Sequence, residues 1–191
     1  MDVSKNEAAD ALTVILRVDD QMLTLRRYAH LAPFLIVWGL VWTGANSVTD
    51  LLPAWTGRAW LIGSAIGLLA SVLWGIRIGR RSARPIGAVR QGPRGRSLVM
   101  MGLVIAGYFP AMYAVLGPLS ARQANAFGSL AWAFGYMVAG AWVGWRLFGI
   151  GVISAAAIVF GYLFIGPHYY LWMAVCGGGA LIAGGLWLRR V

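Results

Sequence analysis

Long apolar stretches separated by short polar segments make up the chain from residue 31 onward. Six of these stretches contain no Asp, Glu, Lys or Arg: residues 31–49, 59–76, 98–117, 124–145, 147–166 and 169–188. A helix needs about 20 mostly apolar residues to cross the hydrocarbon core of a bilayer. The pattern therefore predicts an all-α polytopic integral membrane protein, with six transmembrane helices arranged as three hairpins.

Similar residues recur in the three predicted hairpins. The first, third and fifth stretches carry a glycine at an equivalent place, Gly39, Gly107 and Gly161, and the other three end in LWGIR, WVGWR and GLWLR. Glycine-rich apolar sequence also produces such matches by chance. An internal duplication and a chance similarity therefore both remain open as explanations.

The segment before the first apolar stretch follows a different pattern. Its apolar residues recur at steps of three and four: Ala8, Ala11, Ile15, Val18, Met22, Leu25 and Ala29. This spacing predicts an amphipathic helix over residues 7–29, and Ser4 with Glu7 fits a capping box at its start. Helices that lie on membranes usually have a basic polar face, whereas residues 1–30 hold five acids and four bases. We therefore expect the apolar stripe to pack on protein, either on its own bundle or on a partner.

The distribution of basic residues predicts an orientation. The chain has 191 residues, of which 60% are hydrophobic and 12% charged, whereas about a quarter of the residues of a soluble domain are charged. Of its 16 Lys and Arg residues, only Arg58 and Arg122 fall on the side of the membrane opposite to the others. Cytoplasmic loops carry an excess of Lys and Arg. The chain is thus divided into a cytoplasmic N-terminal helix, residues 1–30, and a transmembrane domain, residues 31–191, with both termini cytoplasmic.

Residues 77–97 form a predicted cytoplasmic loop that is rich in arginine. Its seven arginines are Arg77, Arg80, Arg81, Arg84, Arg90, Arg94 and Arg96. Orientation alone needs fewer, so we expect the surplus to contact anionic lipid headgroups, where each is worth about 1 kcal/mol, or the protein's own acidic N-terminal helix. No aromatic residue is interleaved with these arginines, as single-stranded nucleic-acid binding would require, so nucleic acid is not an expected partner.

Small residues spaced by four positions mark expected helix contacts. They are Gly63, Gly67, Ser71, Gly75, Gly140, Gly144, Ala180 and Gly184. Small residues on one helix face let two backbones approach closely within a membrane. Packing inside the chain is the simpler interpretation, and contact with another subunit is the alternative.

Candidate chemistry within the predicted spans is sparse. None of the six contains an ionisable acid or base, and His30 and His168 fall at opposite ends of the predicted helices, too far apart to share a ligand. The single cysteine, Cys176, excludes an internal disulfide. We therefore expect no catalytic, cofactor or metal site and no enzymatic activity.

Polar residues at depth define an alternative. Asn46, Tyr108 and Tyr113 lie within predicted spans, and Pro110 removes a backbone hydrogen bond from the third. Hydrogen bonds between helices account for them most simply. A polar path for a small solute or an ion through this region is the second interpretation.

Two terminal stretches carry a resemblance to known proteins. They are APFLIVWGLVW at residues 32–42 and YLFIGPHYYLWMAVCGGGALIAGGLWLRR at residues 162–190. Both resemble parts of small, arginine-rich, multi-pass bacterial inner-membrane proteins with no assigned activity, which implies a bacterial inner-membrane location. The sequence favours a non-enzymatic accessory or interaction subunit of a larger membrane complex, with a small-solute or ion transporter or channel near Tyr108, Pro110 and Tyr113 as the alternative.

Overall fold

The described part of the chain is entirely helical. The structure, a computed structural model, describes residues 5–82, 107, 110–112, 114–117 and 119–190, and these contain helices and turns but no strand. Five helices in these ranges are long and apolar enough to cross a membrane: Met22–Leu51, Pro53–Arg80, Ala121–Val143, Trp145–Phe164 and Tyr169–Arg189. The prediction of an all-α protein with membrane-spanning helices is confirmed at this level.

The third predicted span, residues 98–117, falls mostly outside the described residues. Gly107, residues 110–112 and residues 114–116 are helical. Ser4, the first residue of the expected capping box, also lies outside the described ranges. The span at residues 98–117, the total of six spans and the arrangement as three hairpins therefore stay predictions.

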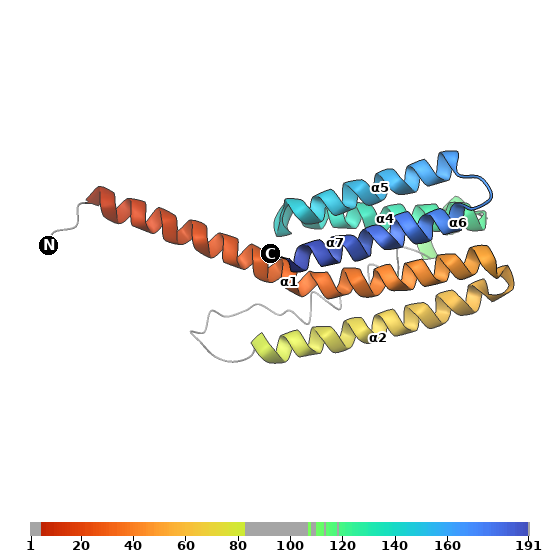
Figure 1. The fold of residues 1–191 in the computed structure, drawn as a ribbon, viewed down its shortest axis with the longest axis horizontal. Helices are drawn as coiled ribbons and strands as arrows, with labels where there is room; N and C mark the ends of the chain where they lie inside the picture. Colours follow the sequence, from red (N-terminus) through yellow and green to blue (C-terminus); the bar gives the residue numbers. More distant parts are fainter. Residues whose placement is uncertain (1–4, 83–106, 108–109, 113, 118, 191) are drawn as a thin grey trace.

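Helix α1 (Lys5–Leu51) joins the amphipathic segment to the first span without a break. The N-terminal helix is thus the first part of a helix of 47 residues, and the division of the chain at residue 30 stays a prediction. Pro33 lies inside α1 and lacks one backbone N–H, which bends a helix more readily than it ends it. Figure 1 shows the helix axis changing direction where the protruding part meets the bundle.

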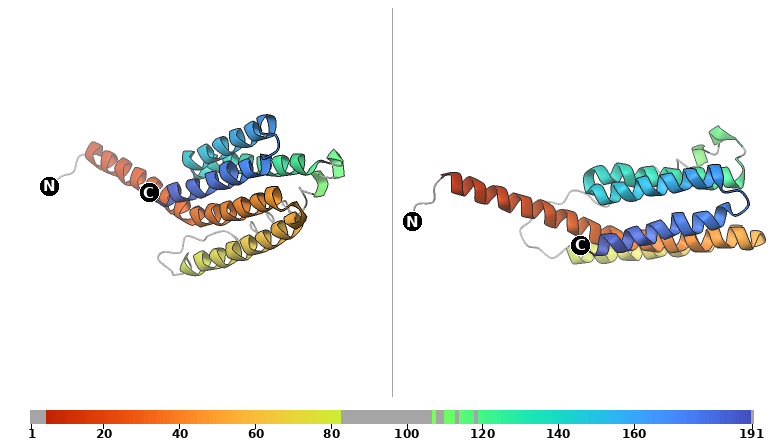
Figure 2. Two further views of the ribbon diagram at one scale, coloured as in Figure 1. Left: turned by 45° about the vertical axis from the view of Figure 1, so that its right-hand side comes forward. Right: turned by 45° about the horizontal axis from the view of Figure 1, so that its top comes forward.

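The helices of the bundle, including the second part of α1, form two layers. In the right-hand view of Figure 2, α4 (Ala121–Val143) and α5 (Trp145–Phe164) make one layer, and α1, α2 (Thr56–Ser82) and α7 (Gly179–Arg189) make the other. The short η1 (Pro53–Trp55) connects α1 to α2, and α6 (Tyr169–Trp172) leads through η2 (Met173–Gly178) to α7. We call the end with residues 52–55 and 165–168 the loop end, and the end with the C-terminus the terminal end.

Some helices pack mainly on a neighbour in sequence, and others pack mainly on a distant one. The fifth and sixth stretches are neighbours in sequence, yet α5 packs mainly on α4, and α7 packs mainly on α1. Two core clusters reflect this arrangement. One, near the terminal end, includes Tyr28, Leu147 and Leu188, and the other, near the loop end, includes Tyr169 and Met173.

A π-helical segment, η2, interrupts the last span. It places Gly178 against α1, where an added Cβ would lie 2.7 Å from the backbone nitrogen of Thr43. A π-turn disrupts the regular ladder of backbone hydrogen bonds, and in an apolar surrounding a freed carbonyl needs another donor. The Ala174 carbonyl keeps a backbone partner here, the Gly179 N–H, and the Thr43 hydroxyl donates a second hydrogen bond to it at 3.1 Å.

The turn between α4 and α5 consists of one residue, Gly144. Its φ of +141° favours glycine, and an added Cβ would collide with the Tyr28 side chain. We expected the break near Arg146 and Gly144 on a packing face of the preceding helix; the break lies at Gly144 itself, and Gly144 meets Tyr28 of α1 from this turn. A charged residue signals the end of an apolar stretch, but here the positive φ at Gly144 ends the helix two residues earlier.

Helices α4 and α5 begin before the predicted apolar stretches, so each includes an arginine near its start. Arg122 belongs to the first turn of α4, and Arg146 to the first turn of α5. The predicted loop at residues 77–97 also starts too early, because α2 continues to Ser82 and includes Arg77, Arg80 and Arg81. No proline precedes residue 85 there, so the helix extends past its apolar part.

The small residues expected to pack helices lie in different surroundings. Added Cβ atoms at Gly63 and Gly67 would lie 3.2 and 3.3 Å from Val41 of α1, and the Ser71 hydroxyl accepts a hydrogen bond from Trp38 at 3.2 Å. Gly75, farther along α2, meets no described neighbour within 4 Å, so the expected contact is absent there.

Closer contacts occur near the terminal end. A Cβ at Gly140 would lie 2.6 Å from the Phe148 Cα, and one at Gly184 would lie 2.8 Å from Ile150. Ala180 lies half-buried in α7. Gly140 and Gly184 thus bring α4 and α7 against α5, within one chain.

Candidate functional site

A chain of polar side chains crosses the bundle near the loop end. The Tyr169 hydroxyl donates to Asn125 Oδ1 at 3.2 Å, Asn125 Nδ2 donates to Asn46 Oδ1 at 3.0 Å, and Asn46 Nδ2 donates to the Trp42 carbonyl at 3.0 Å. Asn46 and Tyr169 are buried, with 0% and 1% of their surface exposed. These hydrogen bonds connect α6, α4 and α1, and each satisfies a polar group that would be costly to bury unpaired.

Arg122 lies beside this chain of hydrogen bonds and binds the end of α5. Its Nη2 lies 2.6 Å from both the Tyr162 and the Ile165 carbonyls and donates to them. The guanidinium also stands 5.3 Å from the ring centre of Tyr162 and 4.9 Å from that of Tyr169. The last carbonyls of a helix have no partner within the helix and carry a partial negative charge. A cation supplied by α4 satisfies both needs, because α4 begins where α5 ends.

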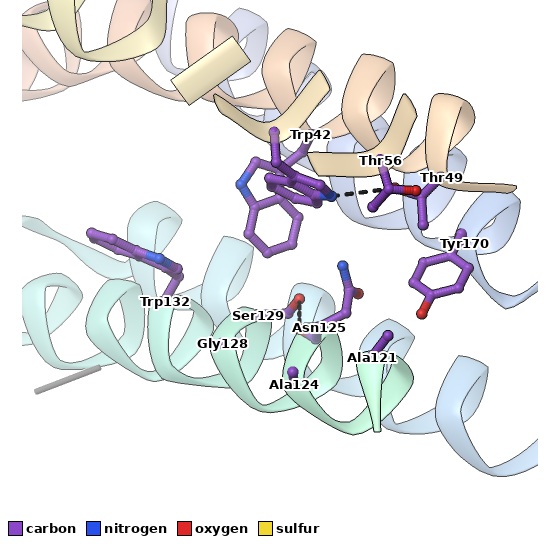
Figure 3. A pocket seen from close by; sticks show the side chains of 11 residues that line it. Trp42, Thr49, Thr56, Ala121, Ala124, Asn125, Gly128, Ser129, Trp132 and Tyr170 are labelled. Atoms are coloured by element: carbon purple, nitrogen blue, oxygen red, sulfur yellow. Dashed lines mark hydrogen bonds between the residues drawn. The ribbon is translucent and has the colours of Figure 1, made fainter. Parts of the chain in front are cut away.

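A pocket of about 330 Å³ opens next to these residues, between α1, the start of α2 and α4. Figure 3 shows Trp42 above it, Trp132 at one side and Tyr170 at the other, with Asn125 and Ser129 reaching up from α4. Most of the lining is aromatic or apolar. The few polar groups include the Ser129 hydroxyl, which donates to the backbone carbonyl of Asn125 at 2.5 Å.

Further contacts fix the rim of this pocket. Trp60 donates its indole N–H to the Thr49 hydroxyl at 3.2 Å, and the Thr49 hydroxyl donates to the Ala45 carbonyl at 2.8 Å. Nearby, His168 Nδ1 lies 3.2 Å from Asp50 Oδ2, which links the loop at residues 165–168 to the last turn of α1. The pocket has the character of a site for a small neutral molecule with an apolar body and one hydrogen-bonding group.

A second arginine occupies the terminal end. The Arg146 guanidinium carbon stands 5.2 Å from the ring centre of Trp187, 5.9 Å from that of Trp145 and 6.0 Å from that of Tyr28. Its Nη1 is buried and has no hydrogen-bond partner among the described residues. Aromatic faces attract a cation through their quadrupole, so this side chain is surrounded by rings rather than bonded to acceptors.

The structure brings only one residue of the expected polar path into this site. Asn46 belongs to the hydrogen-bonded chain. Tyr108 and Tyr113 lie outside the described residues, and Pro110 is exposed in a short helical piece. Among the described residues, the lining of the pocket comes from α1, α2, α4 and α6.

Most of the arginines expected to contact lipid or a partner lie beyond the described ranges. Arg84, Arg90, Arg94 and Arg96 are outside them. In the part of the loop that is described, Arg77 and Arg80 are exposed near the end of α2.

Sequence reasoning missed Asn125, Arg122 and Tyr169 as members of one site. The sequence pattern placed Arg122 only on the side of the membrane opposite to most basic residues, and it gave no role in a site to Asn125 or Tyr169. One signal was available, because an arginine followed by an asparagine three residues later opens an otherwise apolar helix that begins at a Ser120–Gln123 capping box. That signal places Arg122 and Asn125 on one helix face, but it does not reveal their partners on α1, α5 and α6.

Comparisons with known proteins add no relative to this picture. No family model, no curated protein and no solved structure matches the chain.

Proposed function

We propose that this protein is a non-enzymatic integral membrane protein that acts as an interaction or accessory subunit of a larger membrane complex. The observation that carries the proposal is the protruding part of α1. Ile15, Leu16 and Met22 are more than half exposed there, and Figure 1 shows this part of the helix extending beyond the bundle. Large apolar side chains on a helix outside the bundle favour binding to another protein.

The charge of this segment supports the same proposal. Residues 1–30 hold four basic and five acidic residues. Helices that bind the membrane surface use a basic polar face to attract anionic lipids. A nearly neutral helix lacks this attraction, so protein is the partner that its apolar residues fit best.

Affinity purification of the full chain from its native membranes in a mild detergent tests the proposal. We expect stable co-purification of protein partners, identified by mass spectrometry, and their loss when Ile15 and Met22 are replaced by glutamine. Replacement of Leu61 and Leu69 by glutamine serves as the matched control, because these exposed leucines lie on α2, within the bundle. Equal recovery from all three proteins would remove the support for the protruding helix.

A second candidate function is transport of a small solute, and the pocket between α1, α2 and α4 favours it. Its volume of about 330 Å³ and its Asn125 and Ser129 groups would suit a small neutral molecule. Solute uptake by liposomes that contain only the purified protein would support this candidate. We expect a Gly128→Trp substitution, which fills the pocket, to abolish such uptake, while Gly75→Trp, on the open side of α2, leaves it unchanged.

We also propose the bacterial inner membrane as the location, with both termini in the cytoplasm and anionic lipid headgroups in contact with the arginines. The support is the sequence resemblance together with the arginine distribution. Arg26, Arg27 and Arg146 lie near the terminal end, whereas Arg58 lies near the loop end. Reporter fusions at the two termini test the orientation, and a reporter active only outside the cytoplasm would overturn it.

A further inference from the structure

The protruding part of α1 has a period of seven residues. Its apolar positions alternate between steps of three and four and are Ala8, Ala11, Ile15, Val18, Met22, Leu25 and Ala29. In heptad terms the first, third, fifth and seventh of these occupy position a, and the others occupy position d. A period of 3.5 residues differs from the 3.6 of a straight helix, and it keeps the stripe facing one neighbour only when two helices wind around each other.

The middle of this stripe is exposed in the part of the chain that the structure describes. Ile15 is 57% exposed, Val18 48% and Met22 54%. Contact with the bundle begins at Thr24, whose Cγ2 lies 3.3 Å from a Cβ built on Gly144, and continues at Tyr28. The stripe is therefore exposed from Ile15 to Met22 and does not depend there on the face that packs on the bundle.

The residues that flank the stripe are compatible with a second copy of the same helix. In a parallel pair, each position g lies near position e of the next heptad on the other chain. The resulting pairs are Glu7 with Leu12, Val14 with Asp19, and Gln21 with Arg26. None of these pairs brings like charges together, so self-association carries no electrostatic penalty at these positions.

The charge of this segment also differs from that of the rest of the chain. Residues 1–30 hold four basic and five acidic residues, whereas the whole chain has 16 basic and 6 acidic ones. Two bundles would repel each other through their arginines, and the nearly neutral helix would not. We propose that residues 7–29 of two copies of this chain pair as a parallel two-stranded coiled coil, an inference that rests on the proposed interaction role of the protruding helix.

Insertion in a membrane supplies what such a short coiled coil lacks. Isolated helices of this length are marginal in water. Two copies inserted with the same topology project their helices in the same direction, which makes the pair parallel, and anchoring raises the effective concentration of one helix near the other. The association is therefore a property of the full chain in a bilayer.

Cysteine cross-linking tests the proposal in the full chain. Cys176 is the only cysteine, so Cys176→Ala gives a background free of thiols. Ile15→Cys and Leu16→Cys are then compared in native membranes under mild oxidation. Both residues are 57% exposed, but only Ile15 lies at position a. A disulfide needs Cα atoms within about 7 Å, so we expect about tenfold more cross-linked dimer from Ile15→Cys than from Leu16→Cys.

A second pair of variants tests whether the stripe drives the association. With Met22→Cys as the reporter, Ile15→Asp should abolish the dimer cross-link and Leu16→Asp should leave it unchanged. Equal cross-linking at residues 15 and 16, or the absence of cross-links at both, overturns the coiled coil. A cross-link from residue 15 to a different protein also overturns it, while it leaves the proposed interaction role in place.

Discussion

The two ends of α5 are attached to their neighbours by different means. At the loop end, Arg122 donates hydrogen bonds to the Tyr162 and Ile165 carbonyls at 2.6 Å. At the terminal end, the backbones themselves are close: an added Cβ at Gly140 would lie 2.6 Å from the Phe148 Cα. Arg146, at this end, makes no hydrogen bond through Nη1 to the described residues.

Backbone chemistry explains the difference. The C-terminal end of a helix presents free carbonyls and a partial negative charge, so a buried arginine is favourable there. The N-terminal end presents free N–H groups, which an arginine cannot satisfy, and the first turn of α5 contains no acidic residue. Arg122 therefore binds the carbonyls at the C-terminal end of α5, whereas Arg146 packs against aromatic rings at the N-terminal end.

Replacement of Arg122 should have the largest effect on the free energy of unfolding. Arg122→Met keeps much of the side-chain volume but leaves the two carbonyls without their donor. Hydrogen bonds to a charged group contribute about 1.5–3 kcal/mol each, so we expect the free energy of unfolding to fall by about 3 kcal/mol. Reversible unfolding in mixed detergent micelles measures it.

Arg58→Met is the matched control for this experiment. Arg58 lies near the same end but is exposed, and its guanidinium carbon stands 4.8 Å from the ring centre of Trp55. Its loss should cost less than about 1 kcal/mol. Similar losses for both variants would contradict the assignment of Arg122 as the group that attaches α5 at the loop end.

Disruption of the close packing at the terminal end should have the next largest effect. In Gly140→Ala the new methyl group would meet the backbone of Phe148, which cannot move like a flexible side chain. Overpacking of this kind costs about 1–3 kcal/mol, and we expect about 2 kcal/mol in the same unfolding assay.

Gly75→Ala provides the comparison, because a Cβ there meets no described atom within 4 Å. Alanine is a better helix former than glycine by about 1 kcal/mol in an exposed position. This variant should therefore be unchanged or slightly more stable. A destabilised Gly75→Ala together with a tolerated Gly140→Ala would reverse our account of which glycines pack helices.

The sequence made the helices predictable, but not their ends or partners. Apolar stretches located the last three described spans within three residues, because length and hydropathy are set locally, whereas the first two helices extend farther than their apolar stretches. The turn at Gly144 was misplaced, because its positive φ depends on the fit of Tyr28 from α1. The spacing that identified Gly67 and Gly184 as contacts also selected Gly75, because a period of four residues does not say which turn of the helix meets a neighbour.

The polar site was harder to predict for a related reason. Asn46 could be recognised as a polar residue at depth, but its partners Asn125 and Tyr169 come from distant parts of the chain. Pairing of α5 with α4 brings Arg122 to the end of α5. That pairing follows from the one-residue turn at Gly144, but no local pattern brings α1 and α6 to the same place, so the complete site appears only once the helices are assembled.

The hydrogen-bonded chain offers a sharper test of the loop end. Asn125→Leu removes both the donor to Asn46 and the acceptor for Tyr169. A buried polar group left unpaired costs about 1–3 kcal/mol, so we expect a loss of about 1–2 kcal/mol in the free energy of unfolding.

The double variant Asn46→Leu with Asn125→Leu separates pairing from packing. Removing both partners of a buried hydrogen bond costs less than leaving one of them unpaired. The double variant should thus be more stable than the sum of the two single losses predicts, by about 1 kcal/mol of coupling. Additive losses would show that the two amides do not depend on each other.

Arg146→Met should have the smallest effect and completes the comparison between the ends of α5. The substitution is the same as at residue 122, but the lost contacts are those with the rings of Tyr28, Trp145 and Trp187. Such contacts are worth about 0.5–1 kcal/mol each at accessible sites, and methionine replaces part of the packing. Removal of the buried Nη1, which has no described partner, offsets part of the remaining loss. We therefore expect a net change below about 1 kcal/mol, and a loss as large as that of Arg122→Met would show that polar bonds hold both ends of α5.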